Sequence, residues 1–169
     1  TSSPLALRVA IVGAGPAGIY AGNLLANAVK ERGGSVEIDL FESLPAPYGL
    51  IRYGVAPDHP RIKGIVDSLH EMLDAFPEVA EGEEAASRRM IRFIGNVDFG
   101  TDLKLSDLRQ FYDAVIFATG AILDRDLYIP GIDLEGSYGA ADFVSWYDGH
   151  PDFPREWPLS AESVAVIGA

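Results

Sequence analysis

The stretch "LRVAIVGAGPAGIYAGNLLANAVKERGGSVEIDLFES", residues 7–43, decides the fold of this chain. It begins with a short, nearly all-apolar run at residues 7–12, as expected of a strand buried on both faces in a parallel sheet. Gly13, Gly15 and Gly18 follow at the spacing of the dinucleotide-binding fingerprint. In that fingerprint the first glycine permits the tight turn off the strand, the second lets backbone approach a pyrophosphate, and the third lets the helix pack close to the sheet.

A helix and a second strand are predicted after the glycines. Apolar residues recur at helical spacing, and Gly33 with Gly34 ends the helix. The apolar residues of this helix are Ile19, Leu24, Leu25 and Val29. The second strand is expected to place Val36, Ile38 and Leu40 on one face and to end at Glu42.

Glu42 stands 24 residues after Gly18, close to where an acid meets the ribose hydroxyls of an adenosine. Because a carboxylate there repels a 2′-phosphate, this site is expected to hold FAD or NAD and not NADP. The full order of strand, glycines, helix, strand and acid favours dinucleotide binding. The alternative is a glycine-rich turn that binds nothing, with Glu42 merely exposed.

Two later segments carry related patterns. In "SDLRQFYDAVIFATGAIL", residues 106–123, Ser106 is expected to cap a short helix, and residues 114–118 to form a buried strand entering Thr119 and Gly120. The final "SVAVIGA", residues 163–169, repeats the pattern of "RVAIVGA" at residues 8–14. It predicts the first strand of a second nucleotide-binding unit that the chain truncates; the alternative is a C-terminal strand ending in Gly-Ala.

Composition excludes several classes of function. The chain has 169 residues, 48% of them hydrophobic, and no cysteine, so it can hold no disulfide, redox dithiol or thiolate-bound iron–sulfur cluster. Its 3 histidines have neither grouped carboxylates nor HExxH spacing, so no metal site is expected. The net charge of −12 argues against a nucleic-acid partner.

Hydropathy and local charge favour a soluble protein. The longest apolar run, residues 114–123, is too short to cross a bilayer, which needs about 18–20 residues. The start "TSSPLALR" lacks the apolar core of a signal peptide, so secretion is not expected. The acidic "PEVAEGEEAASRR", residues 77–89, is interpreted as a solvated insertion, and the alternative is an acidic patch that docks a partner.

Six motifs occur in order along the chain: "VAIVGAGPAG", "PYGLIRYGVAPDHPRIK", "IRFIGNVDFG", "YDAVIFATGA", "IPGIDLEGSYGAADFVSWYDGHP" and "VAVIGA". Together they resemble the N-terminal part of adrenodoxin-reductase-type ferredoxin–NADP⁺ reductases. The resemblance implies an α/β, Rossmann-like FAD-binding domain of the two-dinucleotide-binding flavoprotein type, with a parallel sheet, over residues 1–122. Residues 123–169 would then be the truncated start of an NADP-binding domain.

The resemblance also implies an activity. Such a flavoprotein takes hydride from NADPH onto FAD and passes electrons singly to a small iron–sulfur protein of the ferredoxin type. Most of the NADPH site is expected to lie outside this chain, and the isolated chain is not expected to complete turnover. The compartment expected for such a protein is the bacterial cytoplasm or the mitochondrial matrix.

The fingerprint and the resemblance together assign candidate FAD-binding residues: Gly13, Gly15, Pro16, Ala17, Gly18, Glu42, Gly49, Leu50, Val97, Thr119 and Gly120. Arg52 is expected to place positive charge near the reduced, anionic flavin. His59 is expected near the edge where nicotinamide stacks, with no proton-transfer role. The alternative is that Arg52 pairs with a carboxylate and His59 caps a turn beside Pro60.

The chain departs from the family at Asp148, where Asn is more frequent. The adjoining Trp146 and Tyr147 are expected to pack the domain junction; the alternative is that one of them shapes the nicotinamide site, where the added negative charge of Asp148 would alter NADPH affinity. Two competing functions remain open: an NADPH-dependent flavin reductase unit like the small subunit of glutamate synthase, and a non-catalytic fragment that binds FAD weakly or not at all. The elements "APDHP" and "FVSWYDGHP" favour the ferredoxin-reductase group.

Overall fold

The computed structural model describes residues 6–75, 90–121, 123–125 and 127–168. Its elements, in order, are β1 (Ala6–Val12), α1 (Pro16–Glu31), β2 (Ser35–Phe41), α2 (Leu50–Tyr53), α3 (Pro60–Lys63), α4 (Ile65–Asp74), β3 (Ile91–Ile94), α5 (Leu105–Phe111), β4 (Ala114–Phe117) and α6 (Ala140–Tyr147). The acidic stretch 77–89 lies outside the described residues, so both interpretations of it stay untested.

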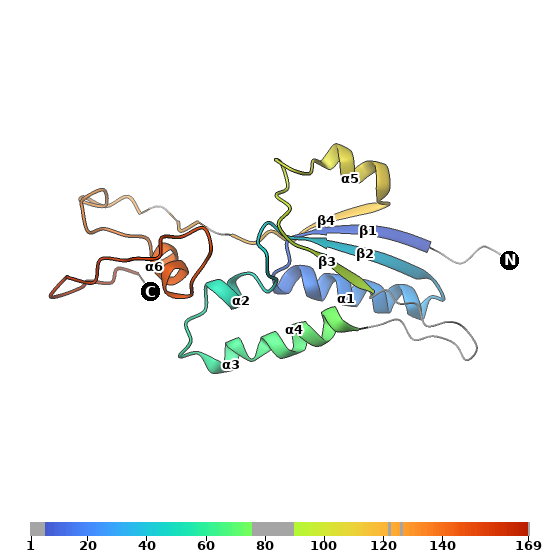
Figure 1. The fold of residues 1–169 in the computed structure, drawn as a ribbon, viewed down its shortest axis with the longest axis horizontal. Coiled ribbons are helices and arrows are strands. Elements are labelled where there is room, and N and C mark those ends of the chain that lie inside the picture. The colour runs from blue at the N-terminus through green and yellow to red at the C-terminus, as the bar shows by residue number, and fades with distance from the viewer. Residues whose placement is uncertain (1–5, 76–89, 122, 126, 169) are drawn as a thin grey trace.

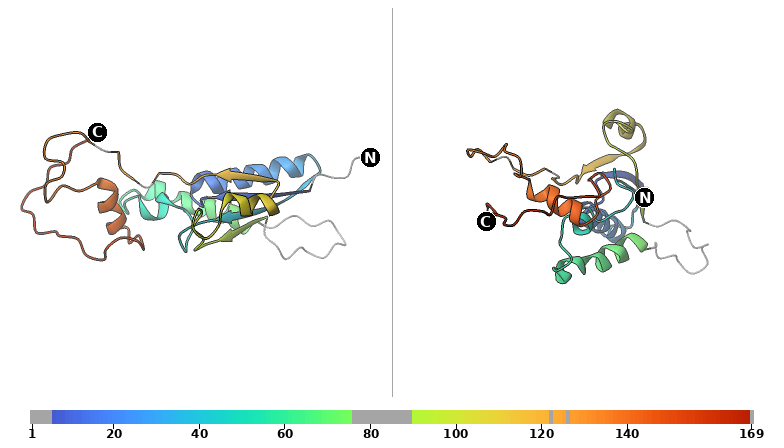
Figure 2. Two further views of the ribbon diagram at one scale, coloured as in Figure 1. Left: turned by 90° about the horizontal axis from the view of Figure 1, so that it is seen from above. Right: turned by 60° about the vertical axis from the view of Figure 1, so that its left-hand side comes forward.

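All strand pairs are parallel, and the sheet order is β3-β2-β1-β4. Helices α1 and α4 cover one face of this sheet and α5 the other (Figures 1 and 2). Parallel strands need a crossover between them, and the crossover helices bury both faces of the sheet. The predicted Rossmann-like α/β fold is confirmed.

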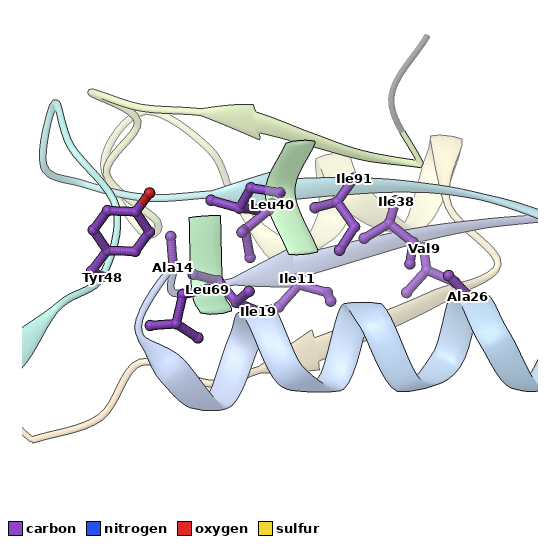
Figure 3. Close-up of a cluster of buried hydrophobic side chains, with 11 residues drawn as sticks. Val9, Ile11, Ala14, Ile19, Ala26, Ile38, Leu40, Tyr48, Leu69 and Ile91 are labelled. Atoms are coloured by element: carbon purple, nitrogen blue, oxygen red, sulfur yellow. The ribbon is translucent and has the colours of Figure 1, made fainter. Parts of the chain in front are cut away.

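The larger part of the core lies between the sheet and helices α1 and α4. Ile11, Ile38, Leu40 and Ile91 from the strands pack there against Ile19 of α1 (Figure 3). A smaller cluster on the opposite face joins strand residues to Leu108 of α5. Both clusters meet the central strand β1, of which residues 9–12 are buried.

Helix α1 has the predicted place and end, but not every apolar residue at its helical spacing lies in the core. Leu24 is 65% exposed. The buried face of α1 runs instead through small residues such as Gly22 and Ala26. A Cβ on Gly22 would lie 3.0 Å from Ile91 Cδ1 and 3.3 Å from Ile11 Cδ1, so the helix packs too closely for a larger residue there, and Leu24 faces outward.

The end of α1 confirms the predicted glycine stop. Gly33 has φ +71°, and its N–H donates to Lys30 O at 2.8 Å. The N–H of Gly34 donates to Val29 O at 3.0 Å. These two bonds form a Schellman motif, which satisfies carbonyls that the helix itself leaves open.

Two expectations around β4 are wrong. Strand β4 is half-exposed, with Phe117 50% exposed, because among the described residues β4 pairs only with β1 and forms an edge of the sheet. Helix α5 is capped by Lys104, not Ser106. The N–H of Lys104 donates to Asp107 Oδ2 at 2.9 Å, and this bond places the start of the helix before Ser106.

The expected strand in "SVAVIGA" is also wrong for the residues that the structure describes. Residues 163–168 form no strand, and Val164 and Val166 are 81% and 90% exposed. A strand requires a neighbour to bond its backbone, and no described strand runs beside this segment.

The segment that contains α6 holds an aromatic cluster of its own. Trp146 lies 5.5 Å from Phe143 and 5.8 Å from Trp157, measured between ring centroids. Two contacts join this segment to the α2–α3 region: the Tyr53 and His150 rings are 5.1 Å apart, and Lys63 Nζ lies 3.6 Å from Asp148 Oδ2.

None of the described helices combines the length and the apolar character needed to span a membrane.

Candidate functional site

The turn after β1 can be built only with glycine at two positions. Gly13 has φ +107°, and a Cβ on it would lie 2.3 Å from Ala118 O. A Cβ on Gly18 would lie 2.0 Å from Gly13 O. The first and third glycines of the fingerprint therefore do what the pattern predicts: they let the chain turn sharply and let α1 approach the sheet.

Gly15 differs, because a Cβ there would meet nothing within 4 Å. Its side-chain position is open space at the N-terminus of α1, where Gly15 is the N-cap and Pro16 the first helical residue. The first helical hydrogen bond runs from Ile19 N–H to Gly15 O at 3.2 Å, so the N–H groups of Ala17 and Gly18 precede it. Within the described residues, the N–H groups of Ala17 and Gly18 have no backbone acceptor. Together with the open space and the positive end of the helix dipole, they fit the pyrophosphate of a dinucleotide.

Glu42 directs its carboxylate at this turn. Parallel pairing of Val12 with Phe41 brings the end of β2 beside the turn. Glu42 Oε2 then accepts the Ala14 N–H at 2.8 Å, while Oε1 accepts Leu44 N–H at 3.2 Å and the Ser43 hydroxyl at 3.1 Å. A carboxylate has about four acceptor positions, so Glu42 retains capacity for a ribose hydroxyl.

A hollow of about 160 Å³ lies at the ends of the strands, and four predicted site residues line it: Gly13, Glu42, Val97 and Thr119. The N–H of Val97 donates to Glu42 O at 3.0 Å, which places the loop after β3 against the end of β2. Gly120 follows Thr119 with φ +69°. The carboxyl edge of the sheet thus gathers residues from four strand ends, the location at which open parallel sheets bind ligands.

The loop after β2 passes directly over the glycine turn. Gly49 has φ +50°, and a Cβ on it would lie 3.1 Å from Gly15 Cα. The N–H of the preceding Tyr48 donates to Ala14 O at 2.8 Å. Leu50 begins α2 and is 53% exposed, so its side chain is available at the surface. The structure therefore brings Gly49 to the glycine turn.

Arg52 is held by its own loop. Its Nε donates to Pro47 O at 2.9 Å, and its guanidinium lies 5.1 Å from the centroid of the Tyr48 ring and 6.0 Å from that of Tyr53. No carboxylate of the described residues forms an ion pair with it, so the alternative interpretation of Arg52 lacks a partner in this part of the chain.

His59 lies away from the glycine turn, at the N-cap of α3. Its carbonyl accepts the N–H groups of Ile62 and Lys63, both at 3.1 Å, and its side chain is 65% exposed beside Asp58, 4.0 Å away. Within the described ranges, no contact joins His59 to residues 13–18. The backbone of His59 caps this helix, as the alternative interpretation expected, and the imidazole does not take part.

Asp148, the departure from the family pattern, meets the same loop. Its side chain is 2% exposed, and Oδ2 lies 3.6 Å from Lys63 Nζ with no hydrogen-bond partner among the described residues. Lys63 Nζ also donates to Arg52 O at 3.0 Å. The buried charge of Asp148 is therefore balanced by a lysine that itself supports the Arg52 turn.

Sequence reasoning missed two contributors to this site. Ala14 supplies the N–H that orients Glu42, and Tyr48 anchors the loop over the glycine turn. Tyr48 is 5% exposed and has φ +89°, a conformation that is rare for a bulky residue. Nothing in local periodicity predicts either role, although the position of Ala14 between two fingerprint glycines was a usable signal.

Among the described residues, no group of three or more His, Cys, Asp and Glu side chains is placed to hold a metal ion.

No family model matches the chain. Curated relatives do. The chain is 41% identical over 170 residues to the mitochondrial NADPH:adrenodoxin oxidoreductase of Arabidopsis thaliana, covering 99% of this chain and 32% of the relative. It is 44% identical over 163 residues to the NADPH-ferredoxin reductase FprA of Mycobacterium leprae, covering 95% of this chain and 33% of the relative. The chain thus spans about a third of the length of these relatives.

Solved structures agree with this match. The structure is similar to that of FprA, a Mycobacterium tuberculosis oxidoreductase, with a TM-score of 0.73 and 42% identity over 87% of this chain and 30% of the other. FprA in complex with NADPH matches with the same TM-score, identity and coverage. The resemblance indicated by the sequence motifs is therefore confirmed: over nearly its whole length, this chain is homologous to about one third of the NADPH-ferredoxin and adrenodoxin reductases.

Proposed function

We propose that this chain forms the FAD-holding part of a reductase that moves electrons from NADPH to a small iron–sulfur protein of the ferredoxin type. The observation that carries the proposal is the open position at Gly15, bordered by free helix amides, with Glu42 aimed at the same turn. Relatives whose names specify NADPH and either adrenodoxin or ferredoxin support the activity. Bound FAD would convert a two-electron donor into a one-electron donor, which side chains cannot do.

Each part of the site has a role in binding. The N–H groups of Ala17 and Gly18 would donate to the pyrophosphate, aided by the helix dipole. Glu42 would accept ribose hydroxyls, and the hollow beside Val97 would take the adenosine end. Gly49 lets backbone pass close to the cofactor, and the exposed Leu50 would cover apolar ring surface.

The loop residues after Gly49 are proposed to act on the flavin electrostatically. The guanidinium of Arg52, held by Pro47 O and the Tyr48 ring, would place positive charge near the reduced flavin. His59 is proposed to lie at the nicotinamide edge. We further propose that residues 1–122 belong to the FAD domain and residues 123–169 to the beginning of the NADP domain, and that the protein works in the bacterial cytoplasm or the mitochondrial matrix.

The function is tested with the natural protein that carries this chain. We expect a yellow protein that oxidises NADPH faster when a small [2Fe–2S] ferredoxin is added as acceptor. The controls are the same assay without acceptor and with an artificial two-electron acceptor. Turnover that does not respond to any iron–sulfur acceptor favours the related reductase units, and a folded, colourless protein that cannot be reconstituted with FAD refutes the proposal.

Replacing Glu42 with alanine is expected to weaken FAD binding by about 10- to 100-fold, because hydrogen bonds to a charged acceptor are lost. The fold is expected to survive, since Glu42 lies at the end of its strand. Fluorescence titration of the apoprotein with FAD measures the effect. Glu37→Ala is the matched control, since Glu37 lies on the same strand with its side chain 57% exposed. Equal FAD affinity of Glu42→Ala and wild type would exclude the ribose role.

A further inference from the structure

Tyr48 has an unusual backbone for its position. It has φ +89°, and of the described non-glycine residues only Asn96 shares a positive φ. Left-handed backbone is disfavoured for a bulky side chain and persists only where the surroundings hold it. The residue after it is Gly49, which touches Gly15 of the glycine turn. Whatever holds Tyr48 in place therefore also sets the position of Gly49.

Four contacts hold Tyr48. Its N–H donates to Ala14 O at 2.8 Å, its ring packs at the end of the core cluster beside Ala14 (Figure 3), and Arg52 covers the ring at 5.1 Å. Its hydroxyl lies 3.0 Å from Nδ1 of His70 on α4. The last contact is the one that ties the loop to a different element of the fold.

The His70 imidazole is itself oriented. Its Nε2 lies 3.0 Å from Asp74 Oδ2, one turn further along α4. With the proton on Nε2 donated to Asp74, Nδ1 is free to accept the Tyr48 hydroxyl. Burial raises the pKa of Tyr48, as does the charge of Asp74, while Arg52 opposes the change. The hydroxyl thus keeps its proton, and the three side chains contact one another in series, Tyr48 with His70 and His70 with Asp74.

We propose that Tyr48 is a positioning residue for FAD: the Tyr48–His70–Asp74 chain fastens the cofactor loop to α4 and keeps Gly49 against the glycine turn. This inference rests on the proposed function, because it takes that turn as the pyrophosphate site. The tether acts through the backbone of Gly49 and through Arg52, and its hydroxyl does not touch the cofactor. It thereby makes FAD affinity depend on a helix that lies outside the fingerprint.

Tyr48→Phe in the natural protein keeps the ring and removes the tether. FAD affinity is expected to fall about five- to tenfold, the effect of one lost hydrogen bond, with faster FAD release in stopped-flow displacement. Tyr53→Phe is the control in the same loop, because its hydroxyl makes no hydrogen bond with the described residues. Tyr112→Phe controls for lost stability, since it removes a hydroxyl bond to Asp39 Oδ2 on the other face of the sheet. Neither control is expected to change FAD affinity.

Variants of His70 separate positioning from general packing. His70→Asn keeps an acceptor near the position of Nδ1, so its FAD affinity is expected to lie within about twofold of the wild-type value. His70→Leu removes the acceptor, so its FAD affinity should fall as much as that of Tyr48→Phe. The double variant Tyr48→Phe/His70→Leu should bind FAD as tightly as either single variant, because the two substitutions remove the same contact. The proposed tether is overturned if the losses of FAD affinity add in the double variant, or if Tyr48→Phe binds FAD with wild-type affinity. A wild-type protein that binds no FAD refutes the proposed function instead, so the two failures are distinguishable.

Discussion

Valine in place of Gly15 is expected to abolish FAD binding while the fold remains intact. The backbone at Gly15 has φ −73° and ψ −179°, which any residue adopts, and a Cβ there meets nothing within 4 Å. The free energy of unfolding of the Gly15→Val apoprotein should therefore lie within about 0.5 kcal/mol of the wild-type value. The added side chain occupies the space assigned to the pyrophosphate, so FAD affinity should fall by more than about 100-fold, or about 3 kcal/mol.

Gly18→Ala provides the contrast within the same turn. Its Cβ would lie 2.0 Å from the carbonyl oxygen of Gly13, so backbone must move, and the apoprotein should lose about 1–3 kcal/mol of unfolding free energy. Isothermal calorimetry with FAD and denaturant unfolding of the apoproteins measure both quantities for both variants. Undiminished FAD affinity in Gly15→Val would show that no pyrophosphate lies at this turn.

Arg92→Met is expected to lower the free energy of unfolding by about 3–5 kcal/mol, because it leaves a buried carboxylate without its cation. The Asp39 side chain is 7% exposed. Arg92 donates to its two oxygens through Nε and Nη2, both at 2.7 Å. The third partner is the Tyr112 hydroxyl, 2.5 Å from Oδ2. Burial and this bond raise the pKa of Tyr112 to about 12, so the hydroxyl stays a donor.

A second substitution tests the cause of that loss. The double variant Asp39→Leu/Arg92→Met removes the stranded charge together with its partner and should recover most of the stability, since apolar replacements of buried ion pairs are often neutral. Urea unfolding of the single and double variants gives the comparison. If Arg92→Met has the same free energy of unfolding as wild type, then Arg92 is not needed to stabilise the buried carboxylate of Asp39. FAD affinity should be similar in all of these variants, because the network lies on the α5 face, away from the glycine turn.

Several local expectations depended on how the chain packs, and packing changed them. Leu24 fits the helical period yet faces solvent, because Gly22 and Ala26 form the close-packed side of α1. Residues 114–118 have the composition of a buried strand, but β4 is a sheet edge within the described chain. The "SVAVIGA" segment repeats the pattern of β1, but no strand of the described residues lies beside it to pair with it. Composition predicts a tendency to form a strand, and pairing decides whether one forms.

The amino-acid sequence by itself determined the β1–α1–β2 unit, its glycine turn and the acid at its end. Each of these depends on residues close in the chain: a glycine that must turn or pack closely, a helical period, and an alternating strand. Only the tertiary structure decided what surrounds that turn. Tyr48 meets His70 across 22 positions and Asp39 meets Arg92 across 53. Such pairs are set by where the crossovers return each element to the sheet, and no local pattern encodes that distance.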